Sequence, residues 1–176
     1  METAHEFFLD ELHDIYNAEK QLVGVLAAAE RDTQRGDAKR AFGRHRKQTE
    51  GHIKRLDAVF QSLEARPEEK TCEGLQGLIE EKQSTEAESL SPELRDLNAL
   101  VSALKVERYE CSAYETLAFM AQQMGHREAA RLLRENLREE QETAKLVLEL
   151  LKASKIHWTE GMEGEAEEPP SRRRAA

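Results

Sequence analysis

The stretch that decides the fold is LVSALKVERYECSAYETLAFMAQQMGHREAARLLRENLREEQETAKLVLELL, residues 100–151. Apolar residues recur in it at alternating steps of three and four, the pattern of helices that pack in a bundle. Gly125 interrupts the pattern once, at a position where a helix can end in a left-handed residue. The stretch therefore predicts two long helices joined by a tight turn, an antiparallel hairpin.

The first half of the chain repeats this arrangement. Thr3 and Glu6 have the spacing of a capping box, and Gly36 and Asp37 predict a left-handed helix end followed by a helix cap. Ser91 and Pro92 have the pattern of a helix start. The expected helices span residues 4–34, 38–64, 92–124 and 127–155. Residues 66–90 form a longer connection with a short helix over 72–83.

Two tight hairpins joined by a long connection predict an all-α, ferritin-like antiparallel four-helix bundle, with a crossover between its second and third helices. An up-down bundle with a decorated middle loop is the alternative. The bundle domain is expected over residues 1–156. Residues 157–176, acidic and then basic without periodicity, are expected to be a disordered charged tail.

Composition limits the classes of function. The net charge of −9 argues against nucleic-acid binding, and no apolar run is long enough to span a membrane. The first residues lack the pattern of a signal peptide, and two cysteines do not make a disulfide framework. These features predict a cytoplasmic protein, and no motif identifies a small-molecule substrate.

Polar residues interrupt the apolar seams at one height. Counted from the two turns at Gly36 and Gly125, Glu19, His52, Glu107 and Glu140 match to within roughly one helical turn, at about 1.5 Å per residue. His45 and Thr49 lie on the same seam as His52, and Glu110 and Tyr114 follow Glu107. The pattern predicts a polar layer at mid-height in the bundle.

Buried carboxylates in such a layer need a bound cation, protonation, or pairing with bases. Glutamates and histidines that project inward from facing helices are typical of iron and manganese sites in bundles. The alternative is a satisfied hydrogen-bonded layer, in which His45 and His52 donate to the glutamates and Arg108 supplies a counter-charge.

The segments FLDELHDIYNAEKQL, KTCEGLQGLIEE, KVERYECSAYETL and MGHREAARLL together resemble the YciE/YciF-like family of bacterial ferritin-like stress-response proteins. The resemblance covers roughly residues 5–155. It implies a ferritin-like bundle, a homodimer and a metal centre. The positions that match the family's inward polar residues are Glu19, His52, Glu107, Glu110 and Glu140.

Three positions depart from the family pattern. Gln48 replaces an expected glutamate, Arg108 an expected histidine and Ala144 an expected aspartate. Because these changes remove ligands and add a positive charge, they predict at most weak or single-ion binding. A member that keeps the bundle and has lost the metal is the limiting case.

Two functions of different classes follow. The first is a metal-binding stress protein holding iron or manganese, with oxidase-type or peroxide-scavenging chemistry. The second is a metal-free, non-enzymatic helical dimer whose polar layer fixes helix register. A third, an iron-storing cage, needs a shell that nothing in the sequence specifies. The wide apolar arc of the first helix, which includes Phe7, Tyr16 and Val23, predicts a homodimer or docking of the crossover helix.

Overall fold

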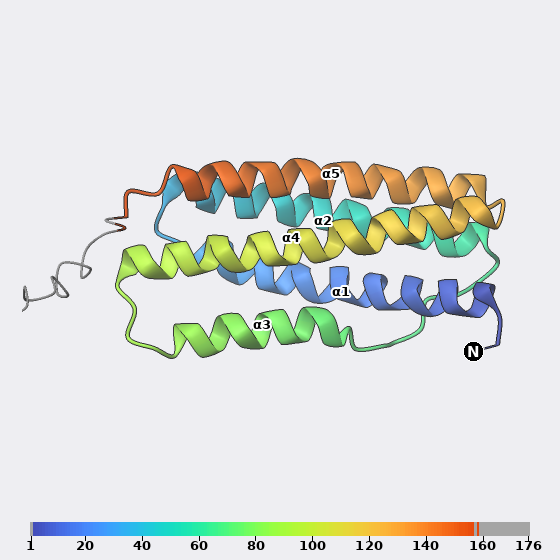
Figure 1. Cartoon of the computed structure of the whole chain (residues 1–176), viewed down its shortest axis with the longest axis horizontal. Helices are drawn as coiled ribbons and strands as arrows, with labels where there is room; N and C mark the ends of the chain where they lie inside the picture. Colours follow the sequence, from blue (N-terminus) through green and yellow to red (C-terminus); the bar gives the residue numbers. More distant parts are fainter. Residues whose placement is uncertain (1, 157, 159–176) are drawn as a thin grey trace, which may run out of the picture.

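The computed structural model describes residues 2–156 and 158, and five helices account for most of them (Figure 1). They are α1 (Ala4–Asp32), α2 (Gly36–Ser62), α3 (Glu73–Glu86), α4 (Pro92–Gln123) and α5 (Arg127–Lys152). The prediction of an all-α bundle with a short crossover helix is confirmed, with boundaries that differ by three residues or fewer. Of the predicted charged tail, all but Trp158 lies outside the described residues.

The four long helices form a bundle in which neighbours run antiparallel. α1 packs on α2, α2 on α5, α5 on α4, and α4 on α1. The segment between α2 and α4 runs back along the bundle, so α2 and α4 point in the same direction (Figure 1). This is the ferritin-like order of connections, and it brings one face of each long helix to a common axis.

Most helix ends form as the sequence predicts. Thr3 and Glu6 make the reciprocal capping box of α1, and the Ser91 hydroxyl accepts from Leu94 N at the start of α4. At the α4–α5 turn Gly125 takes a φ of +81°, which a side chain would disfavour. Local residue types fix these boundaries.

The prediction for the α1–α2 turn is wrong. Gly36 is the first residue of α2 and is not left-handed, and Asp37 makes no cap for the helix. Instead Thr33 and Arg35 are extended, and Asp96 of α4 accepts hydrogen bonds from Gln34 N (3.0 Å) and Arg35 N (2.8 Å). The carboxylate of Asp96, far away in the sequence, therefore accepts the backbone hydrogen bonds of this turn, where the sequence had predicted a left-handed Gly36.

The crossover helix α3 packs on α4 and also adjoins α1 at Val25, which belongs to the wide apolar arc of that helix. Leu75 of α3 is fully buried, and Val25 of α1 lines the same cavity as Leu78 and Ile79. At the start of α3, Cys72 Sγ lies 3.0 Å from Asp14 Oδ2 of α1 and 3.0 Å from Tyr109 Oη of α4. No helix in the described part of the chain is long and apolar enough to cross a membrane.

Candidate metal centre

The predicted polar layer exists at mid-height in the bundle. The five residues predicted for the site come from all four long helices and are each no more than 2% exposed: Glu19, His52, Glu107, Glu110 and Glu140. Each stands where a heptad position turns its side chain to the bundle axis. The structure therefore brings together every residue that the sequence predicted there.

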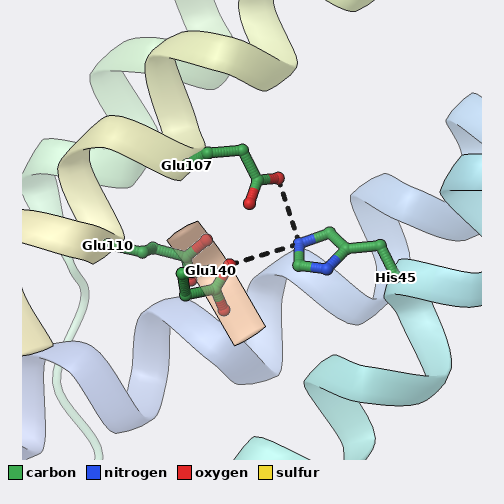
Figure 2. Close-up of side chains that lie close together, drawn as sticks. All are labelled: His45, Glu107, Glu110 and Glu140. Carbon is green, nitrogen blue, oxygen red and sulfur yellow. Dashed lines mark ion pairs between the residues drawn. The ribbon is translucent and has the colours of Figure 1, made fainter. Parts of the chain in front are cut away.

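One group of candidate ligands joins α2, α4 and α5 (Figure 2). His45, Glu107, Glu110 and Glu140 each offer one atom, and these four atoms lie within 4.8 Å of one another. His45 Nε2 is 3.1 Å from Glu107 Oε1 and 3.7 Å from Glu140 Oε2. One imidazole and three carboxylates make a donor set typical of iron or manganese.

A second group shares Glu140 with the first. Glu19, His52 and Glu140 also offer three atoms within 4.8 Å. His52 Nδ1 lies 3.1 Å from Glu19 Oε1 and 2.8 Å from Glu140 Oε1. Glu140 belongs to both groups: its Oε2 faces His45 and its Oε1 faces His52, so this residue would contribute to a metal held at either group.

Many polar atoms of this layer lack hydrogen bonds. Among the described residues, buried atoms without a hydrogen-bond partner include Glu19 Oε2, His45 Nε2, Thr49 Oγ1, Glu107 Oε2 and both carboxylate oxygens of Glu110 and of Glu140. His45 Nε2 is close to Glu107 and Glu140 without the angles of a hydrogen bond. A buried unpaired carboxylate costs several kcal/mol or more. A cation at the common point of these atoms would remove that cost, so the donors fit a metal.

Burial raises the pKa of all four carboxyl groups. Glu107 has a pKa of about 7, and the pKa of Glu110 is well above its usual value because burial and neighbouring carboxylates oppose its charge. Burial likewise raises the pKa values of Glu19 and Glu140, although the nearby imidazole of His52 acts in the opposite direction. Protons therefore replace part of the positive charge when no cation is bound.

The two histidines differ in charge. Burial lowers the pKa of His45, so its imidazole is neutral and able to coordinate. Burial would also lower the pKa of His52, but the carboxylates of Glu140 and Glu19 beside its Nδ1 outweigh this effect and raise the pKa to about 10. His52 is therefore a cation at neutral pH, and it also donates from Nε2 to Glu139 Oε2 (3.0 Å).

A closed hydrogen-bonded ring surrounds the second group. Its six members are His52, Glu19, Tyr114, Asn136, Arg55 and Glu139, each bonded to the next. The Tyr114 hydroxyl donates to Glu19, and the partly exposed Arg55 closes the ring by donating to Asn136 and Glu139 (2.5 Å to Glu139). The ring fixes the positions of Glu19 and His52.

The sequence identified His45 as a member of the layer but assigned it only a hydrogen-bonding role. The geometry makes it a candidate ligand, and its position seven residues before His52 on one seam was the available signal. Arg108 is exposed, so it supplies no counter-charge inside the layer. Ala144 is fully buried and adds no ligand.

Comparison with known proteins agrees with this architecture. The model of a domain of unknown function, DUF892, matches residues 3–157. The chain belongs to the DUF892 family. A curated relative, Protein YciF of Escherichia coli K12, is 40% identical over 144 residues, which cover 81% of this chain and 87% of the relative. The family resemblance seen in the sequence is thereby confirmed.

Solved structures of similar proteins share the fold of this DUF892 chain. The E. coli stress protein YciF superposes with a TM-score of 0.83 at 38% identity, covering 86% of this chain and 96% of that one. YcfI of Rhodopseudomonas palustris superposes with a TM-score of 0.82 at 31% identity, and the match covers 84% of this chain and 94% of YcfI. A Xanthomonas campestris protein at 21% identity, with a TM-score of 0.69 over 86% and 93%, shares the fold alone.

Proposed function

We propose that this chain is a metal-binding, ferritin-like stress protein of the cytoplasm whose mid-bundle layer holds iron or manganese. One observation carries the proposal: two groups of buried donors share Glu140, and most of their oxygens have no other partner among the described residues. Because YciF is a stress protein of the same family, a protective role in stress is the function that this site supports best.

The first ion belongs to the group around His45. That group supplies four residues, and its imidazole is already neutral. Binding at the second group must displace a proton from His52, whose pKa of about 10 makes this cost about 4 kcal/mol at pH 7. These charges favour a single ion at neutral pH, whereas the sequence predicts at most weak or single-ion binding.

When bound, iron or manganese would supply one-electron redox chemistry toward dioxygen or peroxide. The residues of the chain do the rest. His45, Glu107 and Glu110 would hold the ion in a buried layer, and Glu140 belongs to both groups of donors. His52 holds a proton between Glu19 and Glu140, and Glu139 connects it to the partly exposed edge of the bundle.

Metal analysis tests the proposal. Protein reconstituted with Fe(II) or Mn(II) at pH 7 and then desalted is expected to retain about one ion per chain, and His45→Ala to retain none. Glu142→Ala is the control, because Glu142 is exposed and lies outside the polar layer. Wild-type protein without a retained ion at pH 6 to 8 would refute the proposal.

The hydrogen-bonded ring favours a second candidate, a metal-free helical dimer in which the layer fixes helix register. A closed ring that joins all four long helices needs no ion for its own hydrogen bonds. The orphaned oxygens of Glu110 and Glu140 lie outside that ring, and they favour the metal-binding function.

A further inference from the structure

A small cavity lies between α1, α2, α3 and α4, next to the candidate metal centre. Its volume is about 30 Å³, and its walls are almost entirely apolar. They include Leu22, Leu26, Phe42, Leu78, Ile79 and Val106. Two of these side chains, Leu78 and Ile79, come from the crossover helix, so α3 forms one wall of the cavity.

A wider cleft of about 370 Å³ lies beside the cavity, where the end of α1, the end of α3 and the start of α4 meet. The cleft and the cavity share three lining residues, Ala29, Lys82 and Ala99, so the two are neighbours.

The inner end of the cavity is Glu107. This side chain is 2% exposed, lines the cavity, and belongs to the His45 group. Its Oε1 lies 3.1 Å from His45 Nε2, whereas its Oε2 has no hydrogen-bond partner among the described residues. The cavity therefore ends at a candidate ligand of the metal centre.

The side chains that line the cavity determine which molecules it can bind. A metal cation would lose its hydration shell among leucines and alanines, and hydrogen peroxide would lose its hydrogen bonds. Apolar cavities in proteins stay dry and bind small apolar molecules such as xenon. A volume of about 30 Å³ leaves room for one small molecule of this kind.

We propose that this cavity is a dioxygen-binding site that serves the metal centre through Glu107. The proposal rests on the proposed function for its role, since dioxygen at this place needs a bound ion to react with. Its physical content is independent of the metal: a weak apolar site for a diatomic gas, lined by side chains of α1, α2, α3 and α4.

The test uses the full, chelated chain and two gases as probes. Methyl NMR under dioxygen pressure is expected to show the largest paramagnetic relaxation at Leu26, Leu78, Ile79 and Val106. Xenon should shift the same methyl signals and saturate. Ala103→Leu fills the cavity, because Ala103 lines it, and should reduce both effects at least fivefold. Ala113→Leu, the same change ten residues later on α4, is the control and should leave them unchanged.

Relaxation and shifts spread evenly over surface methyl groups in wild-type protein would overturn the proposal. The proposal is also overturned if Ala103→Leu, folded by its circular dichroism, retains the full effects. The proposed function fails separately, when metal analysis finds no retained ion. The measurement on wild-type protein can overturn the proposal by itself, so the test does not depend on whether the variant folds.

Discussion

His45 and His52 lie two turns apart on α2 and face the same carboxylates, yet they hold different charges. Burial keeps His45 neutral, whereas the carboxylates of Glu140 and Glu19 beside its ring keep His52 protonated. In the metal-free layer, one imidazolium and the protons on the carboxyl groups thus offset the negative charge of the glutamates. The stability of the metal-free protein therefore depends on pH.

The metal-free protein is expected to lose stability as pH rises from 5 to 10. Below about pH 4.5 Glu107 is protonated in both the folded and the unfolded chain; between there and its folded pKa of about 7, only the folded chain keeps the proton. Rising pH therefore lowers the free energy of unfolding, by about 3 kcal/mol for this group. The contribution of protonated His52 to the free energy of unfolding is complete below pH 6.5 and is lost as pH rises through about 10.

Urea denaturation of chelated protein at pH 5, 7 and 9 measures this slope. Glu107→Gln keeps the shape of the side chain and removes its titration, so the slope between pH 5 and 7 should flatten. Saturating metal should reverse the trend, because ligand protons must leave for the ion to bind. Greater stability of the chelated protein at pH 9 than at pH 5 would contradict the assigned charge states.

Replacing Glu140 with alanine separates the two proposed functions by the sign of its effect. If the layer binds metal, Glu140→Ala removes the shared ligand and abolishes binding. The metal-free bundle should then become more stable, because one repelling buried carboxyl group is gone. If the layer is only a hydrogen-bonded network, the loss of an acceptor should destabilise the bundle by about 1–3 kcal/mol. Metal analysis and chemical denaturation of this variant, with Glu142→Ala as control, decide between them.

At the scale of the helix, α3 offers a matched pair of glycines. A Cβ on Gly74 would lie 2.8 Å from the ring of Tyr109, whose hydroxyl donates to Asp14 (2.9 Å), whereas a Cβ on Gly77 would meet nothing within 4 Å. Gly77→Ala is expected to stabilise the protein by about 0.5–1 kcal/mol, the usual gain in an exposed helix. Gly74→Ala should destabilise it, because the ring must move.

Thermal or urea denaturation measures both variants, and each is the control for the other, since the same change is made in the same helix. Equal gains from both would show that Tyr109 does not hold the start of α3. Loss of stability in both would show that α3 contributes through its flexibility and not through its packing.

The helices of the bundle could be predicted from the sequence because their signals are local. Each signal involves residues no more than about two helical turns apart in the sequence. These signals are the apolar seams, the Thr3 capping box, the Ser91–Pro92 helix start and the Gly125 helix end. The α1–α2 turn could not, because Asp96, about sixty residues away, supplies its hydrogen bonds. No local rule at Gly36 contains that contact.

The candidate site was predictable for a related reason. Residue counts from two turns fix the height of a helical side chain, so Glu19, His52, Glu107 and Glu140 could be placed together. What counting leaves out is which way each ring nitrogen and carboxylate points. The role of His45, the sharing of Glu140 and the ring through Arg55 depend on those orientations.

For the whole molecule, the open question is what covers its remaining apolar surface. α3 adjoins α1 at Val25, as one branch of the sequence prediction allowed, but Phe7 remains 46% exposed and Phe119 of α4 62% exposed. Large exposed aromatic side chains are typical of interfaces. The homodimer expected from the sequence thus remains a prediction, and these two side chains are its candidate contacts.

Light scattering coupled to size exclusion tests the dimer. The chain has a mass of 20.1 kDa, so a dimer at micromolar concentration should give about twice that value. Phe119→Ser should shift the protein toward monomer, because an aromatic side chain buried in an interface contributes a few kcal/mol to binding. Leu94→Ser, at the far end of the same helix and 41% exposed, is the control and should leave the mass unchanged. A wild-type mass of one chain would exclude the dimer, and a mass of a dozen or more chains would point to a cage instead. A dimer that survives Phe119→Ser but not Phe7→Ser would place its interface on α1, the helix whose wide apolar arc first predicted it.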